Sequence, residues 1–136
     1  MLNEISINYL AVLITAIVSF IIGAIWYSKV LFAKPWERLS NVKMGEGKNL
    51  PLLFIINFIA TFIVAWVFAH TVKYAGATTF IDAILVGFFT WLGYFALATL
   101  LGTILWESKP FNLYLINAGY WLINLLVMAT ILTMWP

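Results

Sequence analysis

The side chains that could do chemistry in this sequence are amides, indoles and phenols set inside long apolar stretches. Four side chains fall at positions i, i+4, i+7 and i+11, which is one stripe of a helix: Asn117, Trp121, Asn124 and Met128. Such groups either form hydrogen bonds between membrane helices or line a cavity for a ligand. The sequence leaves both roles open, and we favour hydrogen bonding because it is the common role of amides in membrane helices.

Other polar residues extend this stripe to neighbouring apolar stretches. Trp91 and Tyr94 lie near the middle of one stretch, where a tryptophan N–H is far from the membrane interface and needs an acceptor. The full candidate ligand stripe contains amides, tryptophans and tyrosines: Asn57, Trp91, Tyr94, Asn117, Tyr120, Trp121 and Asn124. If these residues line a cavity, its ligand is a largely apolar small molecule, such as a lipid or a quinone.

Ionisable groups give no recognisable catalytic constellation. The chain has one histidine and no cysteine, which excludes thiol catalysis, disulfides and haem ligation by two histidines of one chain. His70 and Asp82 are expected near the same membrane face, but no nucleophile accompanies them, so a lipid-modifying enzyme has the least support. We therefore expect no catalytic residue, no metal site and no cofactor.

Four long stretches contain no charged residue at all: Ile5–Ser28, Asn49–Val72, Ala83–Trp106 and Pro110–Pro136. Each exceeds the roughly 20 residues that a helix needs to cross a hydrocarbon core of about 30 Å. The chain is 65% hydrophobic and 9% charged, whereas soluble domains are about 45–50% apolar. Lipid must therefore cover most of its surface.

The predicted fold class is all-α, a single integral membrane domain over residues 1–136 built as a four-helix transmembrane bundle. The helices are expected over about residues 5–28, 50–73, 81–106 and 110–134. The connecting loop 29–49 should contain a short helix lying in the membrane interface, because apolar and charged residues alternate around Pro35 at roughly helical spacing.

The basic residues predict the orientation of these helices. Loop 29–49 carries five of the seven basic residues, and Lys109 follows the third predicted helix on the same side. Only Lys73 lies on the opposite side, so the positive-inside rule places the loop in the cytoplasm and both termini outside. The net charge of +2 is small and gives no reason to expect a nucleic-acid partner.

Small residues recur at four-residue spacing and predict close helix packing. The first predicted helix has a ladder of four, Ala11, Thr15, Ser19 and Gly23, and the third has a pair, Ala98 and Gly102. Such ladders let two helix backbones approach closely where lipid removes the hydrophobic driving force. The partner helix belongs either to the same chain or to a second copy, and the sequence does not separate these cases.

An internal repeat is a further feature of the sequence. Trp26-Tyr27-Ser28-Lys29 closes the first predicted helix, and Trp106-Glu107-Ser108-Lys109 closes the third. Two tandem helical hairpins would produce this similarity. Coincidence would produce it as well, because many membrane helices end in tryptophan and lysine at the inner boundary.

Two pairs of segments resemble a known family. Gly23–Ser28 with Leu31–Trp36 resembles the first-helix signature of the bacterial membrane family called domain of unknown function 1761, and Leu115–Tyr120 with Leu125–Met128 resembles its last-helix signature. The resemblance implies a small four-helix protein of a prokaryotic inner membrane, and it implies no activity.

Two functional hypotheses follow from the sequence. The first is a non-enzymatic membrane protein that assembles with itself or serves as an accessory subunit of a membrane complex. The alternative is a binder or carrier of an apolar small molecule through the candidate ligand stripe. Under both hypotheses the protein is embedded in the lipid bilayer.

Overall fold

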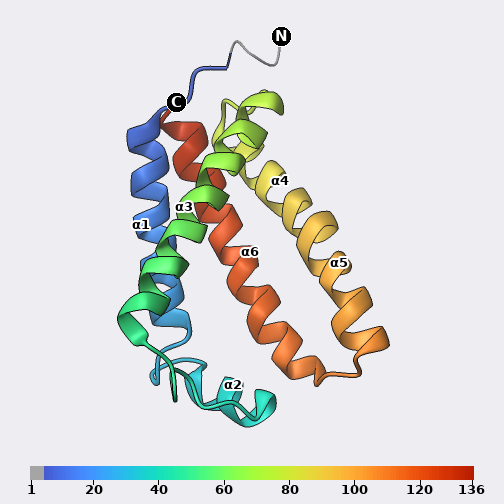
Figure 1. The fold of residues 1–136 in the computed structure, drawn as a ribbon. Coiled ribbons are helices and arrows are strands. Elements are labelled where there is room, and N and C mark those ends of the chain that lie inside the picture. Colours follow the sequence, from blue (N-terminus) through green and yellow to red (C-terminus); the bar gives the residue numbers. More distant parts are fainter. Residues whose placement is uncertain (1–4) are drawn as a thin grey trace.

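The computed structural model describes residues 5–136 and confirms an all-α fold with four long apolar helices (Figure 1). Three of them are continuous α-helices: α1 (Tyr9–Trp26), α3 (Leu50–Tyr74) and α6 (Phe111–Met134). The other, Phe80–Trp106, is called the third membrane helix here. It consists of α4 (Phe80–Thr90), the π-helix η2 (Trp91–Ala96), α5 (Leu97–Leu100) and the π-helix η3 (Leu101–Trp106). All four are long and apolar enough to cross a membrane.

The helix α1 is shorter at both ends than the predicted range 5–28. Its first residue is Tyr9, because the side chain of Asn8 accepts a hydrogen bond from the Ala11 N–H at 3.1 Å and caps the helix. Asn8 Nδ2 also donates to the Pro136 carbonyl at 3.2 Å, so this capping residue ties the start of α1 to the end of α6. The start of α1 and the end of α6 therefore lie on the same side of the bundle (Figure 1).

The helices α3 and α4 also begin at side-chain caps. Asn49 accepts from the Leu52 N–H ahead of α3, and Pro51 fits the first turn because its missing N–H needs no partner there. Thr79 and Asp82 form a reciprocal capping box at the start of α4, in which each side chain accepts from the other's backbone N–H. These caps set where the helices start, and hence their vertical register.

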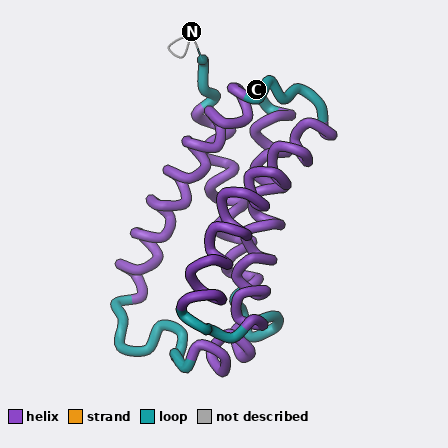
Figure 2. The backbone as a smooth tube through the Cα atoms, turned by 90° about the vertical axis from the view of Figure 1, so that its right-hand side faces the viewer, coloured by secondary structure: helices purple, strands orange, loops and turns teal. Residues whose placement is uncertain are grey.

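The short helix predicted in loop 29–49 is present as α2 (Ala33–Ser40), which is adjacent to α6 beneath the bundle (Figures 1 and 2). Aromatic rings join it to the end of α1. The Phe32 ring lies 4.7 Å from the Trp26 ring, and the Trp36 ring lies 6.5 Å from the Tyr27 ring, measured between centroids. The loop is thus held against the bundle.

The helix α6 is the common neighbour of the other membrane helices. It contacts α1, α3 and α4, and α1 and α3 also contact each other. The third membrane helix meets the rest of the chain mainly through α6. The core cluster lies toward the end of the bundle where α1 begins and α6 ends, and its members include Val12, Phe68, Val72, Met128 and Leu132.

The small-residue ladder of α1 packs within the chain. Ala11, Thr15 and Ser19 are buried, and a Cβ atom added to Gly23 would lie 3.1 Å from the Tyr120 hydroxyl oxygen of α6. The Ser19 hydroxyl donates to Asn124 Oδ1 at 2.6 Å, and both residues are fully buried. The first ladder therefore joins α1 to α6 rather than to a second copy.

The small residues of the third membrane helix behave differently. Ala98 is exposed, and a Cβ atom added to Gly93 or Gly102 would meet nothing within 4 Å. Only Gly87 marks a close approach, because a Cβ atom there would lie 3.1 Å from the Leu125 carbonyl oxygen of α6. The lower part of this helix thus has an open outward face.

The two segments of the internal repeat lie in different surroundings. The Trp26 Nε1–H donates to the Ile116 carbonyl at 3.0 Å and fastens α1 to α6. Its counterpart Trp106 is 85% exposed. The chain does form two successive hairpins, α1 with α3 and the third membrane helix with α6, but the repeated residues do not have repeated roles.

We predict that Gly87→Ala destabilises the protein by about 1–3 kcal/mol, because the added methyl group is forced against backbone atoms that cannot move aside. The measurement is the midpoint of thermal unfolding of the purified protein in one detergent. Gly93→Ala is the control on the same helix, where nothing lies within 4 Å. Equal midpoints for the two variants would contradict a close contact at Gly87.

We also predict a favourable coupling between Ser19 and Asn124. In a double-mutant cycle with Ser19→Ala and Asn124→Leu, the coupling energy should be roughly 0.6 kcal/mol and at most about 1.7 kcal/mol, as for other interhelical hydrogen bonds in membranes. The control pair is Ser19→Ala with Thr130→Val, since the Thr130 hydroxyl bonds within α6 to Leu126. A coupling no larger than that of the control pair would contradict the prediction.

Candidate functional site

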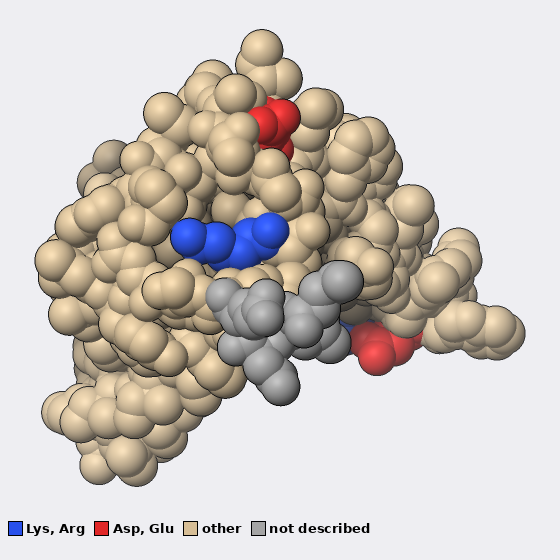
Figure 3. All heavy atoms as spheres, turned by 90° about the horizontal axis from the view of Figure 1, so that it is seen from above, with Lys and Arg blue, Asp and Glu red and all other residues tan. Residues whose placement is uncertain are grey.

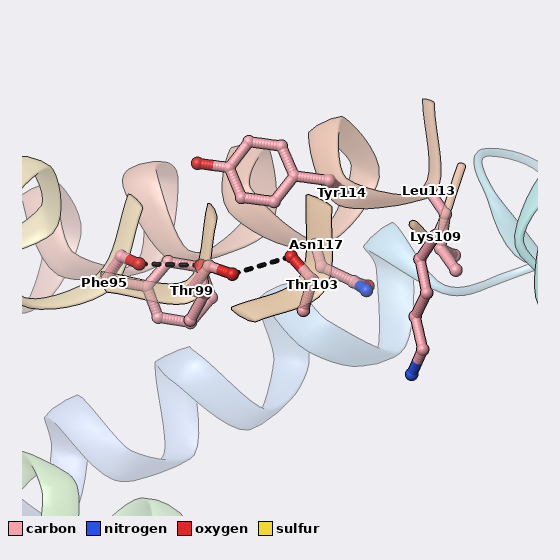
Figure 4. A pocket seen from close by; sticks show the side chains of 7 residues that line it. All are labelled: Phe95, Thr99, Thr103, Lys109, Leu113, Tyr114 and Asn117. Carbon is pink, nitrogen blue, oxygen red and sulfur yellow. Dashed lines mark hydrogen bonds between the residues drawn. The ribbon is translucent and has the colours of Figure 1, made fainter. Parts of the chain in front are cut away.

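A cavity of about 200 Å³ lies between the lower half of the third membrane helix and the first half of α6 (Figure 4). Its lining combines two threonines and a tyrosine with an amide, an ammonium group and apolar side chains: Phe95, Thr99, Thr103, Lys109, Leu113, Tyr114 and Asn117. The helix segments that line it lie toward the end of the bundle that contains α2 (Figure 1). This cavity is the candidate functional site.

Each hydroxyl group that lines the cavity donates its hydrogen to a backbone carbonyl of the protein. Thr99 Oγ1 donates to the Phe95 carbonyl and Thr103 Oγ1 donates to the Thr99 carbonyl, both at 2.7 Å (Figure 4). The Tyr114 hydroxyl reaches across from α6 and donates to the Ala96 carbonyl. Toward a ligand, these three groups can therefore only accept hydrogen bonds.

Two π-helical segments shape the third membrane helix around this cavity. The Leu97 N–H bonds to the Leu92 carbonyl, and the Glu107 N–H bonds to the Gly102 carbonyl, each five residues back. Such i→i+5 turns are rare and occur mostly at functional sites. The sequence predicted a regular helix over 81–106. The paired threonines, whose hydroxyls bond to carbonyls four residues earlier, were the available signal for a distorted helix.

Hydrogen-bond donors are found at one end of the cavity. The Tyr27 hydroxyl donates to Asn117 Oδ1 at 2.8 Å, and burial, reinforced by Tyr120, raises the pKa of Tyr27, which keeps this hydroxyl protonated. No residue among 5–136 accepts from Asn117 Nδ2. Lys109 Nζ lies 3.2 Å from the Glu107 carboxylate, and both side chains are more than half exposed. In Figure 4 the nitrogens of Asn117 and Lys109 lie on the side of the cavity away from Phe95.

The candidate ligand stripe is divided between three environments. Of the stripe residues on α6, only Asn117 lines the cavity. Asn124 is fully buried, its Oδ1 accepts from Ser19 of α1, and its Nδ2 has no hydrogen-bond partner among residues 5–136. The Tyr120 ring packs 5.4 Å from the Tyr27 ring, and the Trp121 ring packs 5.6 Å from the Phe95 ring.

The aromatic and amide residues on the other helices also separate. The Trp91 Nε1–H donates to the Ala118 carbonyl of α6 at 2.8 Å, so the indole predicted to need an acceptor has one. Asn57 is exposed on α3, where the hydroxyl of Thr61 bonds to its carbonyl. Tyr94 is 86% exposed on the third membrane helix. The structure does not bring Asn57 and Tyr94 to the stripe, because similar depth in the membrane does not place residues on the same face.

Six of the seven lining residues were missed by sequence reasoning. Two are apolar, Phe95 and Leu113, and four are polar: Thr99, Thr103, Lys109 and Tyr114. Their hydroxyl and ammonium groups lie near the end of a predicted span, where polar residues are ordinary. The spacing of Phe95, Thr99 and Thr103 at every fourth residue would have placed them on one face. It did not show which other helix they would face.

His70 and Asp82 have local structural partners. His70 Nδ1 lies 2.9 Å from the Trp66 carbonyl of its own helix. The Asp82 carboxylate accepts from the backbone N–H groups of Thr78 and Thr79 at the start of α4. Within residues 5–136, no group of three or more His, Cys, Asp or Glu residues is placed to hold a metal ion.

Comparison with known proteins identifies a family. The family model described as "Protein of unknown function (DUF1761)" matches residues 10–133, which is nearly the whole chain and agrees with the resemblance seen at both ends of the sequence. No curated protein and no solved structure matches the chain. This membrane protein therefore belongs to the DUF1761 family, whose function is unknown.

Proposed function

We propose that this protein assembles in the membrane with a second copy of itself, through the outward face of the third membrane helix. The observation that carries this proposal is Tyr94, which lies near the middle of the span Phe80–Trp106 and is 86% exposed. Its hydroxyl has no hydrogen-bond partner among residues 5–136. A polar group without a partner is costly in hydrocarbon, where no water replaces it, and an acceptor on another chain removes that cost.

The residues around Tyr94 allow such an approach. Leu97, Leu101 and Leu105 are each more than half exposed on the same helix. Gly93 adjoins the tyrosine, and an added Cβ atom there would meet nothing. Small residues beside a large ring permit two backbones to come close, and close backbone packing is a main source of helix association in membranes.

The distribution of buried surface favours the same helix. The third membrane helix has the smallest buried share of the four spans, about 11%, against 17% for α3, 28% for α1 and 39% for α6. The third membrane helix therefore has the most surface available for a partner. A second copy fits this surface because a two-fold interface is self-complementary, and the tyrosine of one chain can then lie over the glycine of the other.

The orientation of the chain is part of this proposal. The end of the bundle that contains α2 has six of the seven basic residues, and Lys73 is at the opposite end. Seen from the end with the chain termini, the surface is largely uncharged (Figure 3). The positive-inside rule then favours the cytoplasmic side of a prokaryotic inner membrane for α2, with both termini outside.

Cysteine crosslinking tests the proposed interface, since the chain has no cysteine of its own. We expect Leu101→Cys in native membranes to give a disulfide-linked dimer on mild oxidation, because that residue lies on the outward face below Tyr94. Ile55→Cys is the matched control. It lies on α3, five residues from the same end of the bundle, with 57% exposure against 55% for Leu101.

Three results of this experiment would count against self-assembly through this face. The first is no dimer from Leu101→Cys, and the second is equally fast crosslinking from Ile55→Cys, which random collision produces. The third is a crosslink only to a different protein, which would indicate an accessory subunit of a larger complex.

The hydroxyl of Tyr94 gives a second prediction. Tyr94→Phe should weaken the dimer by about 0.5–1.5 kcal/mol, the usual net value of one hydrogen bond, which is roughly a two- to tenfold increase in the dissociation constant. The measurement is dimer dissociation on dilution into detergent. Tyr9→Phe is the control, because Tyr9 is 62% exposed at the far end of the bundle. An unchanged dissociation constant for Tyr94→Phe would show that the Tyr94 hydroxyl does not stabilise the dimer.

A further inference from the structure

The polarity of the cavity differs between its two ends. At one end Thr99 and Thr103 present only acceptor oxygens, because their hydrogens are bonded to backbone carbonyls. At the other end Asn117 Nδ2 and Lys109 Nζ present only donors. A ligand group bound at this donor end must supply acceptor oxygens.

The charge around the donor end favours an anion. No acidic side chain lines the cavity. The ion pair between Lys109 and Glu107 lies in water at more than half exposure, so it contributes little and can be exchanged for another anion. This end of the bundle has six basic residues against three acidic ones, which gives a field that attracts negative charge.

The size and position of the cavity limit the rest of the ligand. At about 200 Å³ the cavity is smaller than the roughly 300–1,000 Å³ of pockets that enclose a drug-sized molecule. It holds one end of a molecule and leaves the remainder outside. Because its walls are two membrane helices, with Phe95 and Leu113 on them, that remainder lies among lipid tails.

We infer that this cavity binds the acidic head of a membrane amphiphile, with the carboxylate or phosphate oxygens accepting hydrogen bonds from Lys109 and Asn117 and the acyl chain leaving past Phe95 into the bilayer. The cavity is lined by Phe95, Thr99 and Thr103 of the third membrane helix, and none of them is among the residues of the proposed interface. The binding is therefore independent of the proposed assembly, and either can fail without the other.

Native mass spectrometry of the full chain in detergent tests this inference. The probes are oleate, which has a carboxylate head, and dioleoyl phosphatidic acid, which has a phosphate head on the same acyl chains. Dioleoyl phosphatidylcholine is the zwitterionic control. We expect one molecule per chain of at least one acidic probe to be retained, and the probe that is retained identifies the head group.

Charge variants separate binding at the cavity from adsorption to the basic surface. Lys109→Gln should lower retention of the acidic probe roughly tenfold, because it removes a charge-assisted hydrogen bond. Glu107→Gln should raise retention, because it frees Lys109 from its present partner. Lys73→Gln, at the opposite end of the bundle, should leave retention unchanged.

A variant with a larger side chain in the cavity lining tests whether the probe binds inside the cavity. Thr103→Leu fills part of the lining and should reduce retention as well. Thr130→Leu is its control, since Thr130 also bonds to a carbonyl of its own helix and lies on the far half of α6. Correct folding of each variant is checked by its unfolding midpoint.

Three outcomes would overturn the inference. They are equal retention of phosphatidylcholine and of the acidic probes, retention of no probe at all, and retention of an acidic probe that neither Lys109→Gln nor Thr103→Leu reduces in folded protein.

Discussion

Hydrogen bonds donated to α6 from the helices on either side are the interactions on which the rest of the structure depends. Trp26 at the end of α1 and Trp91 in the third membrane helix both donate their indole N–H to backbone carbonyls of α6, at Ile116 and Ala118. The indole N–H of Trp91 lies inside a membrane span and has no water to turn to. The two bonds therefore fix α6 between its neighbours and place Asn117 between the two accepting residues.

The sequence predicts where this chain enters and leaves the membrane better than which way its helices face. The four spans and the interfacial helix α2 were predictable because charge is absent from the spans and concentrated beside them. The helix starts also have ordinary capping signals, such as Asn49 before Pro51. Which face of each helix points to the protein core is harder to predict, because residues that face lipid are as apolar as residues that face the core.

The candidate site illustrates the same limit. The small residues from Ala11 to Gly23 predict a face of close helix packing, and at Gly23 the structure has a close contact with Tyr120. That α6 would be the partner helix was not predictable from the spacing. Ala98 and Gly102 have the same spacing, but Ala98 is exposed and a Cβ atom added to Gly102 would meet nothing within 4 Å. The cavity depends on two π-helical segments, and a pattern analysis that assumes about 3.6 residues per turn cannot represent them.

The attachment of the third membrane helix has a mechanical consequence. Gly87 seats its upper part against Leu125 of α6, whereas the η3 segment below has no close backbone contact at Gly102. Hydrogen bonds from the Trp91 indole to the Ala118 carbonyl and from the Tyr114 hydroxyl to the Ala96 carbonyl hold the helix to α6 as far down as Ala96. The helix is therefore a lever attached to α6 from Gly87 to Ala96, and its weakly held arm runs from Leu97 to Trp106. A change in bilayer thickness or lateral pressure acts on that arm with the greatest torque, so its effect on the spacing between the two helices is largest at the level of η3.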